Sequence, residues 1–153
     1  MSPRIVPILV FTAALTSGTV SFGQKHFDDA QYLKAASVGE KKGQTVKGIL
    51  RFDGTNKEVQ FVAKGGTAFT AKYDTIKHLL YERTARPRYV SGILLAWPLL
   101  FTKGKKHFLT IQYVDGVGTG QFAVVRLDKS NFREALATAE AETGTKVERA
   151  EED

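Results

Sequence analysis

Apolar side chains alternate with polar ones along residues 108–114 and again along residues 122–127. The alternating apolar sets are Leu109, Ile111 and Tyr113, then Ala123, Val125 and Leu127. Because successive side chains point to opposite faces of a strand, each stretch is predicted to be a strand with one buried face. The glycine-rich residues 115–120 between them are the predicted turn of a β-hairpin.

A helical period replaces the alternation after this hairpin. The apolar residues now recur three or four positions apart, at Phe132, Ala135, Leu136 and Ala139. Asp128 is predicted to cap the start of the helix, and Gly144 stands where a left-handed residue commonly ends one. The chain is therefore predicted to place one amphipathic helix over a sheet.

Further strands are predicted before this unit. Residues 45–63 read as another hairpin, because apolar residues alternate on both sides of the turn that begins at Asp53-Gly54. Residues 67–83 are predicted to form a short extended piece and then a longer strand from Ile76. After the helix, Lys146 to Arg149 are predicted to add a little extended structure.

Residues 1–23 have the features of a secretory signal peptide. Arg4 supplies the positive start, Ile5 to Leu15 form an apolar run, and Ser21 and Gly23 are small residues at the expected cleavage positions. A run of about 11 apolar residues is well short of the ~20 that a spanning helix needs, so a cleaved signal is favoured over an uncleaved anchor. The protein is therefore expected to be exported, either periplasmic or secreted.

The rest of the chain is predicted to form one domain. A length of 153 residues with 42% apolar residues is enough for one hydrophobic core. The predicted divisions are a polar, poorly ordered lead-in over residues 24–44, the domain over 45–147 and an acidic tail over 148–153. The sequence contains no cysteine, which excludes disulfides and thiolate metal sites and leaves the core alone to hold the domain together.

A succession of strands followed by one C-terminal amphipathic helix is the element order of the pleckstrin-homology-like (PH-like) superfold. The chain resembles the bacterial PH-like or GRAM-like domains of small exported proteins in the stretches KGILRFDG (47–54), AKYDTIKHLLYER (71–83), KGKKHFLTIQY (103–113) and RLDKSNFREALATAEAETG (126–144). The resemblance covers about residues 45–147. It implies a mainly β fold with one helix: a bent antiparallel sheet or partly open barrel capped by the C-terminal helix.

The resemblance does not extend to lipid recognition in the first hairpin loop. Eukaryotic phosphoinositide-binding members of the superfold carry a lysine and arginine cluster there, whereas residues 53–57 of this chain read DGTNK. That activity is therefore not transferred to this protein, and fold likeness by itself assigns no function.

The apolar run VSGILLAWPLLF at residues 90–101 is the predicted contact site, because it lies between two basic clusters. Such a run can dip into one leaflet of a membrane while its flanking cations attract anionic lipid. The predicted contact residues are Leu94, Leu95, Trp97 and Phe101, with an electrostatic collar of Arg86, Arg88, Lys103, Lys105 and Lys106. The alternative is that the run is buried as inner strand pieces or as a flap over the sheet.

The sequence favours a non-enzymatic binding or scaffold module that contacts a membrane surface through residues 90–101. The alternative is a module for protein partners or self-association, which uses the same run or a sheet edge near Phe69. The net charge of +6 is spread along the chain without a block, so nucleic acid is not an expected partner. No cofactor is predicted.

No catalytic or metal-binding residue is predicted either. His78 and His107 fall on predicted strands, where together with Asp74 or Asp115 they offer zinc ligands, but no recognised ligand spacing is present. The favoured interpretation is two half-exposed strand histidines. The glycines of residues 116–120 lack the lysine that follows in a phosphate-binding loop, so they are interpreted as a hairpin turn.

Overall fold

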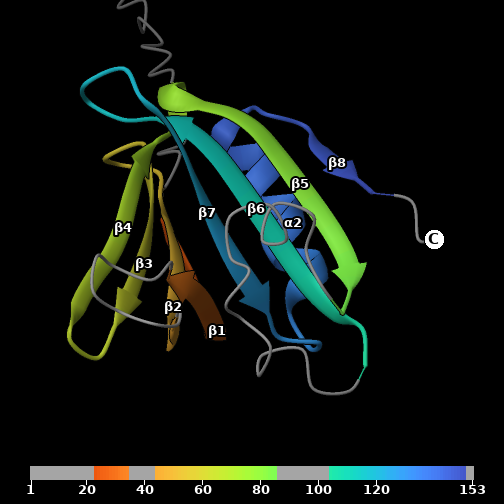
Figure 1. Ribbon diagram of the computed structural model, residues 1–153. Helices are drawn as coiled ribbons and strands as arrows, with labels where there is room; N and C mark the ends of the chain where they lie inside the picture. Colours follow the sequence, from red (N-terminus) through yellow and green to blue (C-terminus); the bar gives the residue numbers. More distant parts are fainter. Residues whose placement is uncertain (1–22, 35–43, 86–103, 151–153) are drawn as a thin grey trace, which may run out of the picture.

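The computed structural model of the protein describes residues 23–34, 44–85 and 104–150. In these ranges the strands form one sheet in the order β4-β3-β2-β1-β7-β6-β5-β8, accompanied by one α-helix (Figure 1). The elements are β1 (Gln24–Lys34), β2 (Gln44–Asp53), β3 (Glu58–Ala63), β4 (Gly66–Lys72), the single 3-10 turn η1 (Tyr73–Thr75), β5 (Ile76–Thr84), β6 (Lys106–Val114), β7 (Gly120–Leu127), α2 (Phe132–Thr143) and β8 (Val147–Arg149).

β1 joins two halves of the sheet. It pairs with β2 along most of its length, but with β7 only through Gln31 and Tyr32. Its register shifts between Phe27 and Ala30, where Asp29 has a left-handed φ of 57°. A bulge of this kind adds one residue to a strand and bends it. The sheet therefore bends at β1 into a β1–β4 half and a β5–β7 half (Figure 1).

The helix α2 closes the space between these halves, running behind β5 and β6 in the view of Figure 1. Its buried residues are Ala135, Leu136, Thr138 and Ala139, which follow the predicted helical period. The helix ends as predicted, since Gly144 adopts a left-handed φ of 69°. The predicted cap at Asp128 is wrong: Asn131 occupies the N-cap position, and the Asp128 carboxylate accepts a hydrogen bond from the Ser130 backbone N–H.

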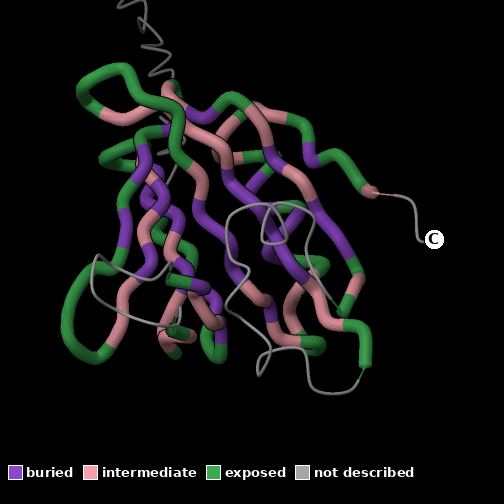
Figure 2. The backbone as a smooth tube through the Cα atoms, in the orientation of Figure 1, coloured by how far each residue is buried: buried purple, intermediate pink, exposed green. Residues whose placement is uncertain are grey.

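The core lies on the inner face of the bent sheet. Burial follows the strands while exposed residues gather in the turns (Figure 2). Large side chains that are essentially inaccessible to solvent fill this core, among them Leu50, Phe52, Val59, Phe61, Leu79, Leu109, Ile111, Val125 and Leu136. Phe108, Thr110 and Val124 alternate with core residues of β6 and β7 and are buried too, so both faces of these strands exclude solvent.

The predicted mainly β fold with one C-terminal helix is confirmed, and a bent sheet covered by that helix is the architecture that the PH-like resemblance implies. Two details differ. β8 pairs with β5 in parallel, so the sheet is mixed rather than wholly antiparallel. The sheet is also open, because β4 and β8 lie at opposite edges instead of closing a barrel. In the described part of the chain, no helix combines the length and apolarity that crossing a membrane requires.

The prediction of a poorly ordered lead-in over residues 24–44 is wrong at its start. Gln24–Lys34 is β1, the strand at which the sheet bends, and Gln44 already belongs to β2. The prediction missed β1 because its buried residues Phe27, Ala30 and Leu33 are three positions apart. The bulge at Asp29 accounts for the spacing of Phe27 and Ala30, whereas Ala30 and Leu33 fall on opposite faces of the strand, so no period of two marks it.

Candidate anion-binding site

Most of the predicted contact residues lie outside the described residues. Those are Leu94, Leu95, Trp97, Phe101, Arg86, Arg88 and Lys103. Lys105 and Lys106 of the predicted collar are described: Lys105 is exposed just before β6, and Lys106 is half-buried in its first position. Lys106 pairs with Thr84 at the end of β5, which fixes the place from which residues 86–103 depart and return.

Four elements meet at this end of β5 and β6. In the strand register Arg83 of β5 lies opposite His107 of β6, and Tyr81 lies opposite Arg149 of β8. His107 also lies opposite Leu127, the last residue of β7, so the turn into α2 starts beside it. The register thus gathers residues that are up to 68 positions apart in the sequence, from Tyr81 to Arg149.

An aromatic stack forms the wall of a cavity here. The rings of His107 and Phe132 lie nearly parallel with centroids 3.8 Å apart, and the Tyr81 ring lies 5.8 Å from that of Phe132. The Tyr81 hydroxyl and His107 Nδ1 are hydrogen-bonded at 2.7 Å. Stacking and this hydrogen bond fix the three rings relative to one another.

Cations surround this stack. The cavity has a volume of about 600 Å³ and is lined by Tyr81, Arg83, His107, Lys129, Ser130, Phe132, Arg133 and Arg149. The guanidinium carbon of Arg149 lies 5.5 Å from the centroid of the Tyr81 ring, and that of Arg133 lies 5.6 Å from the Phe132 centroid. No carboxylate lines the cavity among the described residues, so its electrostatic potential is positive.

The charges of Lys129, Arg133 and Arg149 are not neutralised by neighbours. All three side chains are exposed, and within the described ranges none of them forms an ion pair with a carboxylate. Burial, with Arg83 and Lys129 adding to it, lowers the pKa of His107 below its ordinary value, whereas Asp128 opposes the shift. The imidazole beside these cations is therefore mostly neutral near pH 7.

A smaller cavity of about 190 Å³ adjoins the first, and His107 and Lys129 line both. Its carboxylates are Asp29 and Asp128, and Asp128 is held by the Ser130 hydroxyl at 2.6 Å, a hydrogen bond that lowers the Asp128 pKa. We call the seven lysines and arginines that line the two cavities the basic end: Arg83, Lys105, Lys106, Arg126, Lys129, Arg133 and Arg149.

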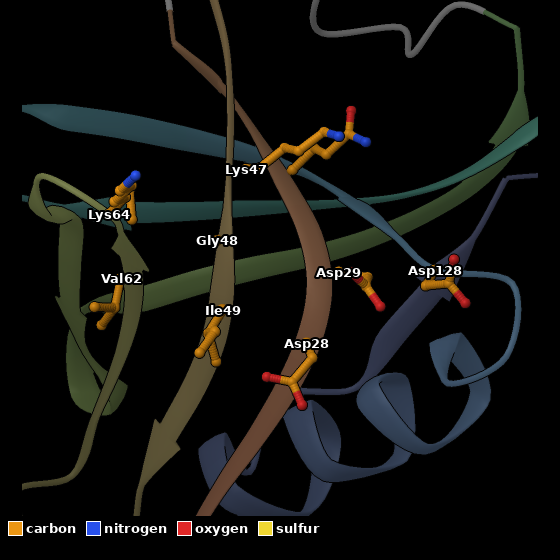
Figure 3. Close-up of a pocket in the computed structure, with 10 residues that line it drawn as sticks. Asp28, Asp29, Lys47, Gly48, Ile49, Val62, Lys64 and Asp128 are labelled. Carbon is orange, nitrogen blue, oxygen red and sulfur yellow. The ribbon is translucent and has the colours of Figure 1, made fainter.

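A third cavity of about 650 Å³ lies along β1 and β2 and shares Asp29, Gln31 and Asp128 with the smaller cavity; we call it the β1–β2 groove (Figure 3). Its charged residues are Asp28, Asp29 and Asp128 together with Lys47 and Lys64. Gly48 lies in its floor. Since the two signs of charge are mixed, the groove offers no single class of ionic ligand a clear advantage.

The strand register separates the two histidines of the zinc alternative. His78 lies opposite Gln112 whereas His107 lies opposite Arg83, so the two histidines are five residues apart along β5. His78 instead contacts Glu148, with Nε2 3.3 Å from a carboxylate oxygen. Within the described ranges no three metal-ligating side chains come together.

The sequence analysis found only Lys105 and Lys106 of the basic end. Arg83 belongs with Arg86 and Arg88 to the basic cluster before the apolar run but is not among the predicted contact residues, and the remaining cations of the basic end lie beside residues with an obvious structural role. A signal was available in the segment Lys129 to Arg133, KSNFR, which sets two cations and an aromatic residue at the start of the helix. Only the pairing of β5 with both β6 and β8 reveals that Arg83 and Arg149 join them.

Comparisons with known proteins add little to this site. No protein-family model and no curated protein matches the chain. The chain is similar to a chain in the structure of the Spt16D Pob3N heterodimer, with 13% sequence identity and a TM-score of 0.49. The match covers 86% of this chain but only 56% of that chain. A likeness at this level carries no functional argument, so the fold is described from its own strand order and helix.

Proposed function

We propose that the protein is an exported, non-enzymatic binding module whose basic end contacts a membrane surface bearing anionic lipids. The observation that carries the proposal is the charge of this end: seven lysines and arginines against two aspartates line two adjoining cavities. A lysine or arginine near an anionic membrane surface contributes about 1 kcal/mol to binding. Several such residues on one end of a small domain favour a single orientation on the surface.

The place of the apolar run supports the same orientation. Residues 90–101 belong to the segment between Ala85 and Gly104, which are the described residues on either side of it. Both points adjoin the basic end, because Arg83 and Thr84 pair with His107 and Lys106. The predicted contact residues Leu94 and Trp97 are thus attached at the end of the domain that carries the positive charge.

Vesicle co-sedimentation tests the proposal. Replacing Lys105 and Lys106 by glutamine is expected to weaken binding to phosphatidylglycerol vesicles by about thirtyfold, from about 1 kcal/mol per lysine. The matched control replaces Lys77 and Lys34, which are exposed on strands outside the basic end. Equal affinities for the two double variants, or no vesicle binding by the wild-type protein, would remove the proposal.

The contribution of the apolar run is a separate measurement. A Trp97→Ser, Leu94→Ser double variant is expected to bind the same vesicles more weakly and to show a smaller fluorescence change, because Trp97 is the one tryptophan in the sequence. Unchanged binding by this variant would confine the contact to the basic residues and would favour burial of the run within the domain.

A second candidate function is recognition of a protein partner or of another copy of the chain. β4 is an edge strand of the sheet, and it carries Phe69 of the predicted edge site on its buried face. An edge strand can add a strand from another chain through its unpaired backbone groups. Light scattering coupled to chromatography distinguishes this function, since self-association through the edge predicts a mass that rises with concentration.

A further inference from the structure

The larger cavity of the basic end is more specific than a charged surface. Its cations come from different elements: Arg83 from β5, Lys129 from the turn before α2, Arg133 from α2 and Arg149 from β8. The concave wall brings these charges around one space of about 600 Å³. A flat surface attracts anions without selecting them, whereas converging donors select an anion by its size and charge.

Two of the arginines are held in position by the aromatic stack. Arg149 lies over Tyr81 and Arg133 lies over Phe132, both in cation–π geometry. Because the rings are themselves stacked and hydrogen-bonded, the guanidinium groups lose less freedom when they bind a ligand. A guanidinium presents paired N–H donors that match two oxygens of a phosphate group.

Neighbouring groups reinforce the preference for an anion. Asn131 at the N-cap of α2 makes no side-chain capping hydrogen bond, although Glu134 in the first turn partly offsets the positive charge of the helix start. Asp128, the carboxylate that acts on His107, is already bonded to the Ser130 backbone N–H and hydroxyl. The lining of the cavity therefore leaves excess positive charge for a ligand to neutralise.

We propose that this cavity binds a phosphate monoester, with Arg133 and Arg149 as its principal contacts. A monoester carries close to two negative charges near neutral pH, whereas the diester of a common phospholipid carries one. Four converging cations favour the dianion over the monoanion. The monoester has two possible sources, a lipid headgroup or a soluble phosphate. With a lipid headgroup as its source, this inference rests on the proposed function.

The test titrates the whole protein with inorganic phosphate and follows the ring resonances of His107 by NMR. His107 reports on the cavity because it lines it without being one of the proposed principal contacts. Saturable shifts are expected in the wild-type protein, and an affinity at least tenfold weaker in the Arg133→Gln, Arg149→Gln double variant. The charge-matched control is Lys77→Gln, Lys146→Gln, two exposed lysines outside the cavity, which should bind like the wild type.

The second arm compares vesicles with phosphatidic acid, a monoester, and vesicles with phosphatidylglycerol, a diester, at matched surface charge. Tighter binding to phosphatidic acid, lost in the double arginine variant, identifies a lipid headgroup as the ligand. Equal binding to both vesicles, together with saturable phosphate binding, identifies a soluble phosphate instead. If the double variant does not fold, Lys129→Gln in the exposed turn replaces it; a smaller but measurable loss of phosphate affinity is expected, and an unchanged affinity overturns the site.

The outcomes separate this inference from the proposed function. No saturation by phosphate in the wild-type protein, or equal affinity in the arginine and lysine double variants, overturns the phosphate site even when vesicles bind. Saturable phosphate binding without any vesicle binding overturns the membrane proposal and leaves the phosphate site standing.

Discussion

The β1–β2 groove and the larger cavity of the basic end are similar in size, about 650 and 600 Å³, but they are built from different constraints. In the groove, Gly48 lies where the neighbouring strand leaves no space for a side chain: a Cβ atom on it would lie 2.3 Å from the Val62 carbonyl oxygen. The basic cavity exists where exposed cations surround an aromatic wall.

This difference separates residues that the fold requires from residues that the proposed phosphate ligand requires. Gly48 lies where β2 pairs with β3, so a change there disturbs the sheet itself. Arg133 and Arg149 are exposed and contact mainly the rings beside them, so the fold tolerates their loss. Depressions of equal volume can thus arise from packing in one place and from binding chemistry in another.

The largest expected effect is at the groove. Gly48→Ala should lower the free energy of unfolding by about 3 kcal/mol, because its methyl group would overlap the Val62 oxygen and a Phe61 ring carbon 2.7 Å away. Urea denaturation measures the loss. Gly65→Ala is the control, since nothing lies within 4 Å of its added methyl group, and it should change stability by less than about 0.5 kcal/mol. Equal stability of the two variants would mean that the sheet tolerates a side chain at position 48.

The next effect concerns the basic cavity. The Arg133→Gln, Arg149→Gln double variant should lose only about 1–2 kcal/mol of stability, since a cation–π contact at an exposed site contributes about 0.5–1 kcal/mol. Thermal and urea melts measure it beside the phosphate titration. A loss as large as that of Gly48→Ala would place these arginines among the residues that the fold requires.

A smaller effect on stability is expected at Asp29, where the β1–β2 groove adjoins the smaller cavity of the basic end. Its φ of 57° is unfavourable for any residue with a Cβ atom, so Asp29→Gly should be more stable than Asp29→Ala by about 1 kcal/mol. Both variants remove the carboxylate, so their difference in urea denaturation isolates the backbone. The same pair of substitutions at Asp28 supplies the control, because its φ is not positive and alanine should be the better residue there.

The smallest effect is a pH dependence of stability. Burial, assisted by Arg83 and Lys129, lowers the pKa of His107 below its ordinary 6.5, so the unfolded chain takes up a proton more readily than the folded one. The stability linked to His107 is therefore complete above pH 6.5 and is lost as the pH falls through the folded pKa. Urea unfolding at about pH 7.5 and about pH 5.5 should show a larger loss for the wild type than for His107→Gln. Parallel losses in the two proteins would contradict the assignment.

The fold was predictable wherever local pattern and topology agree. The hairpin of β6 and β7 and the helix ending at Gly144 follow from alternation, turn glycines and helical spacing alone. β1 was not predictable, because the bulge at Asp29 separates Phe27 and Ala30 by three positions and Leu33 is buried on the opposite face from Ala30. The sequence predicted extended structure at β8 but not its parallel pairing with β5, because the sequence of a three-residue strand does not indicate the direction in which it pairs.

The candidate site was predictable only in part, for a different physical reason. Lys105 and Lys106 belong to a visible cluster, but Arg83, Lys129 and Arg149 become neighbours only through strand register. Register is a long-range property set by the packing of the whole sheet. A one-dimensional pattern can therefore predict that a residue is exposed without predicting which distant residue will lie beside it.

The parallel pairing of β8 with β5 has a consequence for the order in which the molecule matures. Arg149 reaches Tyr81 only after the final strand has docked, because Leu79, Leu80 and Tyr81 are its pairing partners. During synthesis, a chain that has emerged as far as Gly144 already contains seven strands and the helix, yet it lacks one arginine of the larger cavity. The cations of the proposed phosphate site are thus complete only after the rest of the domain has been made.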